Sequence, residues 1–386
     1  MIRRTTKLFL INIFILSLFF ACSQEINEDP ENIINNFNNY DVANDSLFKL
    51  EEINIGTKLE NPWAIQFIND NEIIVTEKRG NLIYANLNKN IHHIIKHEIP
   101  LVQYGQGGLL DVKFHKKYLY VTFTIQDDNK KFSTAIGRGK FTENYKVLRD
   151  FEILFEAEPF YSSGKHFGSR LIINDDYLYA TIGERGQGDV SQNLDSHAGS
   201  IIRINLDGTV PDNPFEGNLK EIFMIGVRNP QGIALSEEEE IIISNHGAKG
   251  GDFIGGVEGG ANYGWNKIGW GGTNYSGTKI GDGIPFSEEY KYPILSWVPS
   301  IAPSDLIFYY GKEFPDWRGD ILVTSLKYKL LIKLDYNDGK VTNEEIIFKD
   351  KIGRLRDIDI NSEGEIYLIT DEPNSCLLYT SDAADE

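Results

Sequence analysis

The run Phe114-His-Lys-Lys-Tyr-Leu-Tyr-Val-Thr122 joins an apolar residue, a polar turn and a β-rich segment that ends on threonine. Aromatic and β-branched residues that follow a short polar turn indicate the second strand of a hairpin. The phrase returns as Ile173-Asn-Asp-Asp-Tyr-Leu-Tyr-Ala-Thr181. A phrase that recurs within one chain predicts a structure built from repeats.

Four more copies keep this order and end on Thr or Ser, at Thr76, Ser244, Thr324 and Thr370. In chain order the six final residues are separated by 46, 59, 63, 80 and 46 positions. A four-stranded propeller blade needs about 40–50 residues, and longer intervals indicate inserted loops. The repeats therefore predict an all-β fold, a six-bladed β-propeller of four-stranded antiparallel blades. A β-sandwich or another barrel is the less favoured alternative.

The composition is that of a globular protein with an acidic surface. Of the 386 residues, 41% are hydrophobic and 25% are charged, which is ordinary for a soluble domain. The formal net charge is −19. A surface this acidic repels phosphate backbones, so we expect no nucleic-acid partner. A basic cluster in such a chain requires a local reason.

The N-terminus is typical of an export signal, with basic residues before an apolar run at residues 8–20. Leu-Phe-Phe-Ala-Cys at residues 18–22 resembles a lipobox, so we predict a lipoprotein-type signal peptide at 1–22 and lipid attachment to Cys22. A plain cleaved signal or a retained membrane anchor is the alternative, although this apolar run is short for a spanning helix. We expect an exported lipoprotein, periplasm-facing or on the cell surface, that meets a bacterial membrane through its lipid only.

The rest of the chain divides into three parts. Residues 23–48 are rich in Asn, Asp and Glu and are predicted to form a flexible tether. Residues 49–374 hold the predicted propeller. Residues 375–386 resemble the in-frame translation of a transposase adapter used in sequencing libraries, and we predict that they are an artefact without function.

Short motifs, most of them glycine-rich, lie between the repeats. They are residues 106–111, 164–170, 183–186, 212–215, 226–232, 246–252, 260–265, 301–304 and 354–357. Taken together and in this order, they resemble the PQQ-dependent glucose and aldose sugar dehydrogenases, the glucose/sorbosone dehydrogenase family. The resemblance runs from about Leu59 to Asp371, and it implies the same six-bladed propeller that the repeats predict.

The resemblance implies an oxidoreductase that uses pyrroloquinoline quinone (PQQ) and calcium to oxidise an aldose sugar at C1 to the lactone. His166, in Gly-Lys-His-Phe-Gly, matches the family's catalytic base. An imidazole with a pKa of about 6.5 suits the removal of a hydroxyl proton near neutrality. Arg228 matches a residue that hydrogen-bonds the quinone oxygen, where a guanidinium stabilises developing negative charge.

The resemblance also implies a set of cofactor contacts. Lys327, Arg354 and Arg356 match the residues that hold the PQQ carboxylates, and a tricarboxylate needs concentrated positive charge and forked donors. Taken alone, Arg354 and Arg356 also fit a solvated strand edge. The further matched contacts are Gln106, Asn229, Gln192, Glu184 and Trp297, of which Glu184 stands where the family usually has Asp.

Calcium is implied at the backbone carbonyls of Gly247 and Ala248. Hard cations take oxygen ligands, and backbone carbonyls suffice when the cofactor supplies more oxygen. The family usually has Pro at position 248, and a backbone ligand survives its replacement by alanine. The ion would act as a Lewis acid that polarises the quinone carbonyl.

Two other functions compete with a sugar dehydrogenase. A calcium-dependent lactonase-type propeller hydrolase would bind its metal through carboxylates and would not need Lys327, Arg354 and Arg356 together. A cofactor-free surface propeller that binds carbohydrate or a partner protein would not need His166 with Arg228. The first reading implies a small-molecule sugar substrate and a downstream electron acceptor, a quinone or a cytochrome.

Overall fold

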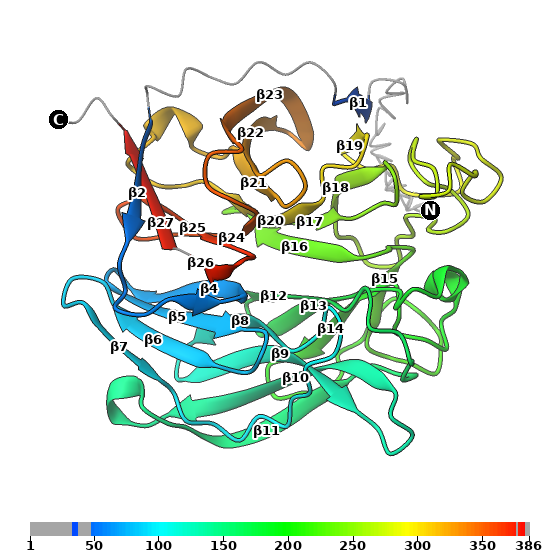
Figure 1. The fold of residues 1–386 in the computed structure, drawn as a ribbon. Coiled ribbons are helices and arrows are strands. Elements are labelled where there is room, and N and C mark those ends of the chain that lie inside the picture. Colours follow the sequence, from blue (N-terminus) through cyan, green and yellow to red (C-terminus); the bar gives the residue numbers. More distant parts are fainter. Residues whose placement is uncertain (1–32, 38–47, 376, 383–386) are drawn as a thin grey trace, which may run out of the picture.

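Each hairpin phrase forms the first two strands of a blade in the structure, a computed structural model that describes residues 33–37, 48–375 and 377–382. The fold is the predicted all-β, six-bladed propeller of four-stranded antiparallel sheets (Figure 1). The first three blades hold β4 (Pro62–Asn69), β5 (Glu72–Glu77), β6 (Leu82–Asn86) and β7 (Ile91–Ile94); β8 (Leu109–His115), β9 (Tyr118–Gln126), β10 (Phe132–Phe141) and β11 (Leu148–Glu156); and β12 (Gly168–Asn174), β13 (Tyr177–Ile182), β14 (Ser200–Asn205) and β15 (Ile222–Ile225).

The next two blades follow the same order. They hold β16 (Pro230–Leu235), β17 (Ile241–Asn245), β18 (Asp252–Gly256) and β19 (Leu295–Val298), then β20 (Pro303–Phe308), β21 (Ile321–Ser325), β22 (Leu330–Asn337) and β23 (Lys340–Lys349). The long predicted insertion in this part is the connection between β18 and β19, residues 257–294. It lies beside blade four, close to the loops at one end of the inner strands.

Blade six closes the ring with both ends of the described chain. It contains β24 (Leu355–Ile360), β25 (Ile366–Thr370), β27 (Leu377–Asp382) and, as its outermost strand, β2 (Phe48–Ile53). Leu377 and Leu378 are buried at 1% and 7% exposure, so they fill the third strand of the blade. The origin of residues 375–386 stays a prediction, but their apolar residues are compatible with this strand.

Three short strands lie outside the regular blades. β3 (Leu59–Glu60) pairs with β26 (Pro373–Ser375), and β1 (Ile34–Asn36) adds in parallel to the outer edge of β19. Residues 34–36 fall within the predicted tether, and this described part of it is bound to blade four. Cys22 and the predicted signal peptide lie outside the described residues.

The core lies between the blades. Apolar residues form six separate buried clusters, one at each junction between neighbouring sheets, including the junction that joins blade six to blade one. The innermost strands β4, β8, β12, β16, β20 and β24 contact one another in a closed ring. Burial of apolar area between sheets therefore holds the ring together, and the inner strands line its centre.

The recurring Thr is explained by contacts between blades. In the first three blades its hydroxyl accepts a hydrogen bond from its own inner strand, from the amide of Ala64, Asp111 or Arg170. It donates to a carbonyl on the inner strand of the next blade. These donated bonds run from Thr76 to Leu110 (2.6 Å), from Thr122 to Ser169 (2.7 Å) and from Thr181 to Pro230 (3.1 Å).

One of the buried arginines, Arg170 on β12, contacts the inner strands of all the other blades. It donates to the carbonyl oxygens of Gln231 (2.6 Å), Ser304 (3.0 Å) and Arg356 (3.1 Å). It forms ion pairs with Asp357 (2.5 Å), Asp111 (3.4 Å) and Asp305 (3.5 Å), and its Cζ lies 4.2 Å from the ring centroid of Trp63. The side chain is 3% exposed, so its charge is balanced inside the ring.

We expect Thr122→Val to lower the free energy of unfolding by roughly 1–3 kcal/mol, because the isosteric change leaves the Asp111 amide and the Ser169 carbonyl buried without this partner. Ser244 is the matched control. It occupies the same repeat position, but its buried hydroxyl has no hydrogen-bond partner among the described residues. Urea unfolding should show a change of less than about 0.5 kcal/mol for Ser244→Ala. Equal losses for the two variants would contradict the inter-blade role.

Candidate active site

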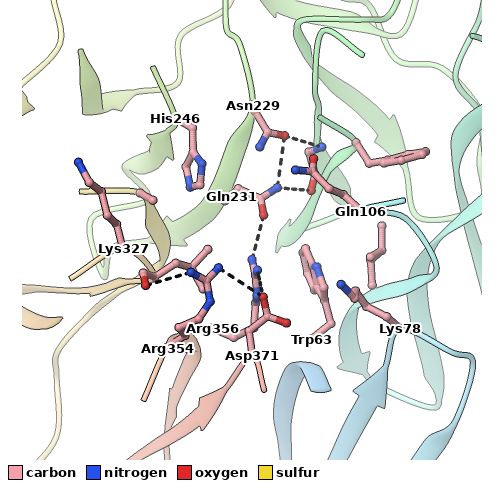
Figure 2. A pocket seen from close by; sticks show the side chains of 15 residues that line it. Trp63, Lys78, Gln106, Asn229, Gln231, His246, Lys327, Arg354, Arg356 and Asp371 are labelled. Atoms are coloured by element: carbon pink, nitrogen blue, oxygen red, sulfur yellow. Dashed lines mark hydrogen bonds and ion pairs between the residues drawn. The ribbon is translucent and has the colours of Figure 1, made fainter. Parts of the chain in front are cut away.

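A cavity of about 440 Å³ borders the Arg170 network, at one end of the inner strands (Figure 2). Its wall includes Trp63, Gln231 and Arg356, each of which also contacts Arg170 or supplies it with a carbonyl. Of the predicted site residues, five line it: Gln106, Asn229, Lys327, Arg354 and Arg356. Side chains from distant motifs therefore meet at one place because the ring of inner strands brings them there.

Positive charge dominates the cavity wall. Among the described lining residues, Lys78, Lys327, Arg354 and Arg356 carry positive charge and Asp371 alone carries a carboxylate. Burial lowers the pKa of Lys78, and the neighbouring Arg356 and Arg354 lower it further against the attraction of Asp371. In a chain with a net charge of −19, this local excess of cations favours an anionic ligand.

Two side chains hold the Arg356 guanidinium, and one of its three nitrogens has no partner among the described residues. Its Nη1 donates to Gln231 Oε1 at 3.0 Å, and its Nη2 donates to Asp371 Oδ2 at 2.8 Å. Its Nε is buried and has no hydrogen-bond partner among the described residues. Burial would raise the pKa of Asp371, but the positive charges of Arg356 and its neighbours outweigh that and lower it.

Lys327 and Arg354 are less constrained. The Lys327 ammonium donates to the Ser300 carbonyl at 2.7 Å, and Arg354 Nη1 lies 3.4 Å from the Leu326 carbonyl. Arg354 remains 45% exposed and lies 3.9 Å from Asp371. Both side chains can therefore turn toward a ligand in the cavity by exchanging one backbone contact.

His166 lies next to this cavity and is oriented by a carboxylate. Its Nδ1 is 2.6 Å from Glu184 Oε1, and its backbone amide donates to Gln106 Oε1 at 2.7 Å. Glu184 Oε2 also accepts from the amides of Gln187 (2.5 Å) and Gly188 (3.0 Å), so the carboxylate stays ionised. An ionised carboxylate accepts the Nδ1 proton and leaves Nε2 of neutral His166 as the basic nitrogen.

The pKa of His166 is set by opposing effects. Burial lowers the pKa, the hydrogen bond that His166 donates to Glu184 raises it, and the charge of Arg228 lowers it, so that the net pKa is below the ordinary value of 6.5. The imidazole is therefore neutral near pH 7. The backbone at His166 has φ +52°, a left-handed conformation that a non-glycine residue adopts at a cost and that often marks a functional site.

Arg228 lies near the same oxygen of Glu184 that His166 binds. Its Nε is 4.0 Å from Glu184 Oε1, and its Nη1 is 3.4 Å from the His246 carbonyl. The side chain of Asn245 accepts from the amides of both Arg228 and Asn229, each at 3.0 Å, which places both residues at the end of β17. Burial lowers the pKa of His246, and Arg228, Arg356 and His166 lie close enough to lower it further, so His246 joins the two halves of the site.

At three of the predicted cofactor contacts the structure shows other partners, and their role toward a cofactor stays a prediction. Glu184 is a partner of His166 and of two backbone amides, and these bonds occupy both of its oxygens. Gln192 uses its amide to bind Asn262 and the Trp265 carbonyl, and it does not line the cavity. Trp297 is fully buried between blades four and five, where its indole donates to Glu344 at 2.9 Å.

Gly247 and Ala248 lie in a tight loop that Asp252 shapes. Asp252 Oδ1 accepts from the Gly247 amide at 2.7 Å, and its Oδ2 accepts from Ser300 Oγ (2.5 Å) and the Ala302 amide (2.6 Å). Among the described residues no donor binds the carbonyl oxygens of Gly247 or Ala248. Within those residues there is also no group of three His, Cys, Asp or Glu side chains that could hold a metal. A metal in this region would have to rely on backbone and ligand oxygen.

The sequence prediction missed several residues that line the cavity: Trp63, Lys78, Gln231, His246, Leu326 and Asp371. A signal for them was present. Lys78, His246 and Leu326 each stand two positions after the recurring Thr or Ser, and Asp371 stands one position after it. These positions follow the strands directly, at the end of the ring where the cavity lies. Arg170, Asp111 and Asp357 likewise end three of the quoted motifs but received no role.

Comparisons with known proteins agree with this architecture. The family model described as glucose / sorbosone dehydrogenase matches residues 59–379. Aldose sugar dehydrogenase YliI of Escherichia coli is 34% identical over 340 residues, which cover 84% of this chain and 91% of that protein. Quinoprotein glucose dehydrogenase B of Acinetobacter calcoaceticus is 26% identical, with coverages of 82% and 84%.

A solved structure supports the same relationship. The apo-form of the soluble aldose sugar dehydrogenase from Escherichia coli superimposes with a TM-score of 0.82 and 32% identity, covering 87% of this chain and 99% of that one. In the part of this chain that the structure describes, no helix is long and apolar enough to cross a membrane.

We expect Asp371→Asn to lower the free energy of unfolding at pH 7 by about 1–3 kcal/mol, because it leaves Arg356 without its charged partner. Since the folded pKa of Asp371 is lowered, its stabilising contribution is present above the ordinary pKa of 3.8 and is lost as the pH falls through the lowered value. The difference from wild type should therefore narrow below about pH 4. Urea unfolding across pH measures this.

Glu363→Gln is the control, because Glu363 pairs with Lys312 at 3.6 Å on the open surface, where the two side chains are 66% and 75% exposed. We expect a change of less than about 0.5 kcal/mol there. An Asp371→Asn effect that is equally small, or that grows on acidification, would show that Asp371 does not balance the cavity cations.

Proposed function

The chain belongs to the glucose/sorbosone dehydrogenase family and is an oxidoreductase that acts on sugars; on that basis we propose that it uses PQQ and calcium to oxidise an aldose at C1 to the lactone, with His166 as the general base. The observation that carries the proposal is that a cationic cavity lies next to a histidine that a carboxylate orients. A cavity with four cationic side chains adjoins an imidazole whose Nδ1 is bound by a buried carboxylate.

The residues of the cavity fit PQQ. A flat tricarboxylate needs several cationic donors and apolar surface for its rings, and the wall offers Lys78, Lys327, Arg354 and Arg356 beside Trp63 and Phe167. Arg354 is 45% exposed and the Lys327 ammonium donates to one backbone carbonyl, so both side chains can reach a ligand in the cavity. We propose that these four cations hold the carboxylates and that Gln106 and Asn229 contribute further hydrogen bonds.

When bound, PQQ supplies an o-quinone that accepts the hydride leaving the sugar C1. The chain must supply the matching proton acceptor, because the C1 hydroxyl loses its proton as the C1–O bond becomes a carbonyl. His166 Nε2 is the proposed acceptor. Glu184 holds the opposite nitrogen, which fixes the tautomer and stabilises the imidazolium that forms when the proton arrives.

Arg228 has two proposed roles that follow from its position. Burial lowers the pKa of His166 most, and the Arg228 guanidinium lowers it further, which keeps the base neutral near pH 7. The guanidinium also provides a fixed positive charge at the site, suited to stabilising negative charge on a bound quinone oxygen. Its contacts with the His246 carbonyl and Glu184 hold it in place before any substrate arrives.

Calcium is proposed at the loop of Gly247 and Ala248. The two carbonyl oxygens are suitable hard ligands, and Asp252 holds the loop in shape through three hydrogen bonds rather than as a ligand. A carboxylate-bound metal, which a lactonase-type hydrolase would need, has no candidate cluster among the described residues. The cavity chemistry thus favours the dehydrogenase over that alternative and over a cofactor-free binding propeller.

The cellular setting is also a proposal. We propose an exported lipoprotein that is anchored through Cys22 and passes its electrons to a membrane quinone or a cytochrome. Support comes from the N-terminal sequence alone, since residues 1–32 lie outside the described part of the chain.

We expect the purified protein to bind PQQ in the presence of Ca²⁺, with quenching of tryptophan fluorescence, and then to reduce a dye with an aldose. Arg356→Met and Lys327→Met should each weaken PQQ binding by roughly ten- to a hundredfold, because each removes a charge-assisted contact. His166→Ala should bind PQQ but lose turnover. A calcium chelator should abolish activity, and added Ca²⁺ should restore it.

Lys312→Met is the matched control, because it removes one positive charge from the open surface, where the side chain is 75% exposed. It should leave PQQ affinity and activity unchanged. No PQQ binding by the wild-type protein, together with no activity across a broad panel of aldoses, would overturn the proposed function.

The pH profile tests the pair formed by His166 and Glu184. We expect kcat/KM to rise with pH to a plateau through a midpoint below 6.5, since burial and Arg228 lower the pKa of the base. Glu184→Gln removes the negative charge that raises this pKa, so the midpoint should move to lower pH. The plateau should fall by roughly ten- to a hundredfold, because the imidazolium loses its stabilising carboxylate. Glu184→Asp keeps the charge and should retain most of the profile. A midpoint that moves upward in Glu184→Gln would contradict these roles.

A further inference from the structure

A short N-terminal segment, residues 33–37, is bound to the propeller next to the cavity loops. It lies upstream of the stretch that matches the family model, residues 59–379. β1 pairs in parallel with β19, and the Phe37 amide donates to the Val298 carbonyl at 3.0 Å (Figure 1). Ile33 and Phe37 are buried at 4% and 8% exposure. The segment is therefore packed against blade four rather than laid loosely on its surface.

The first contact of the segment reaches the loop proposed for calcium. A methyl group at Gly271 would lie 2.7 Å from Cδ1 of Ile34 and 3.1 Å from the Val298 side chain. A methyl group at Gly250 would lie 3.3 Å from the same Val298 side chain. Ile34 and Val298 therefore both lie against Gly271, and Val298 also lies against Gly250 in the loop. Movement of Ile34 would leave Val298 and the loop beyond it less supported.

A second contact is polar and leads to the same loop. The Asn35 side-chain amide donates to Glu344 Oε2, and Trp297 donates to the other oxygen of this carboxylate at 2.9 Å. The Trp297 carbonyl in turn accepts from the Gly251 amide at 2.9 Å. Trp297 therefore links the two: its indole shares the Glu344 carboxylate with Asn35, and its carbonyl binds the Gly251 amide.

The third contact leads to a cation that lines the cavity. The ring of Phe37 stacks on Tyr328 with centroids 5.5 Å apart and an angle of 21° between the planes. The Lys327 ammonium lies 4.6 Å from the centroid of the same Tyr328 ring and lines the cavity. A ring held between an apolar neighbour and an ammonium group restricts the positions that the long lysine side chain can adopt.

We infer that residues 33–37 are positioning residues of the active site: Ile34 and Asn35 brace the loop of residues 247–251, and Phe37 braces Lys327 through Tyr328. The inference rests on the proposed function insofar as the cavity is the PQQ site. Lysine side chains lose much rotamer freedom on binding an anion, and a ligand site that is already ordered avoids that loss. The segment thereby raises the fraction of molecules that are ready to bind the cofactor.

Phe37→Ala tests the inference, with Phe37→Tyr as the conservative variant. The control Phe67→Ala removes an aromatic contact of similar size, because Phe67 packs on Tyr367 at 4.8 Å between blades one and six. Hydrogen exchange of the protein without cofactor is the first measurement. Phe37→Ala removes both the ring that packs on Tyr328 and a buried apolar anchor of the whole segment, so the amides of Lys327 and Gly251 should both exchange about tenfold faster than in wild type. In Phe37→Tyr and Phe67→Ala they should not.

The dissociation constant for PQQ with Ca²⁺ is the second measurement. It should rise about tenfold in Phe37→Ala if one tenth of the molecules keep the ordered site, with a smaller change in kcat. Phe37→Tyr should restore it. Exchange at Lys327 and Gly251 in Phe37→Ala that equals that in Phe67→Ala would overturn the inference. If exchange is faster in Phe37→Ala but the wild-type protein binds no PQQ, the bracing role stands and the proposed function is wrong.

Discussion

Six inner strands meet around one buried guanidinium, and the geometry of the propeller depends on how that charge is balanced. Arg170 donates to carbonyls of three inner strands, pairs with aspartates of three, and lies over the indole of Trp63 on a further one. A buried cation that loses partners is costly, so any displacement of one inner strand would be opposed by the network as a whole. The apolar clusters between blades supply most of the burial, while Arg170 sets where the inner strands must converge.

The active-site cavity is built directly on this network. Gln231 and Arg356 give their carbonyls to Arg170 and turn their side chains toward the cavity, where they bind each other. The floor of the cavity is therefore as fixed as the ring itself. Its wall is basic although the chain is acidic overall, because Asp371 balances only part of the charge of the four cations. That unbalanced charge is what a tricarboxylate would neutralise.

Much of this arrangement was predictable from sequence, and the physical reasons differ between its parts. The six blades were predictable because the same hairpin phrase recurs six times, and in the first three blades its final Thr makes the same inter-blade bond, so there the local pattern records a tertiary contact. The basic trio was predictable because Arg354 and Arg356 stand in one of the quoted motifs and Lys327 matches a residue of the same family. These three side chains meet at one cavity because the blades are arranged in a ring, so no further sequence motif is needed to predict it.

Other features have no local signature. Glu184 could be read as a ligand contact because a sequence does not show that His166 and two amides occupy its oxygens. The same holds for Trp297 and Gln192, because the sequence does not show whether an indole or an amide faces a cavity or a neighbouring blade. The pairing of β1 with β19 joins segments about 260 residues apart and was hidden in a stretch that is polar enough to suggest a tether.

The central claim is that the cationic cavity beside His166 is a site for an anionic quinone. A crystal structure of the protein with PQQ and Ca²⁺ tests it most directly. The account predicts that PQQ occupies the cavity, with its carboxylates on the side chains of Lys327, Arg354 and Arg356 and with His166 Nε2 facing it. PQQ bound elsewhere, or a cavity left without it at saturating concentration, would contradict the claim.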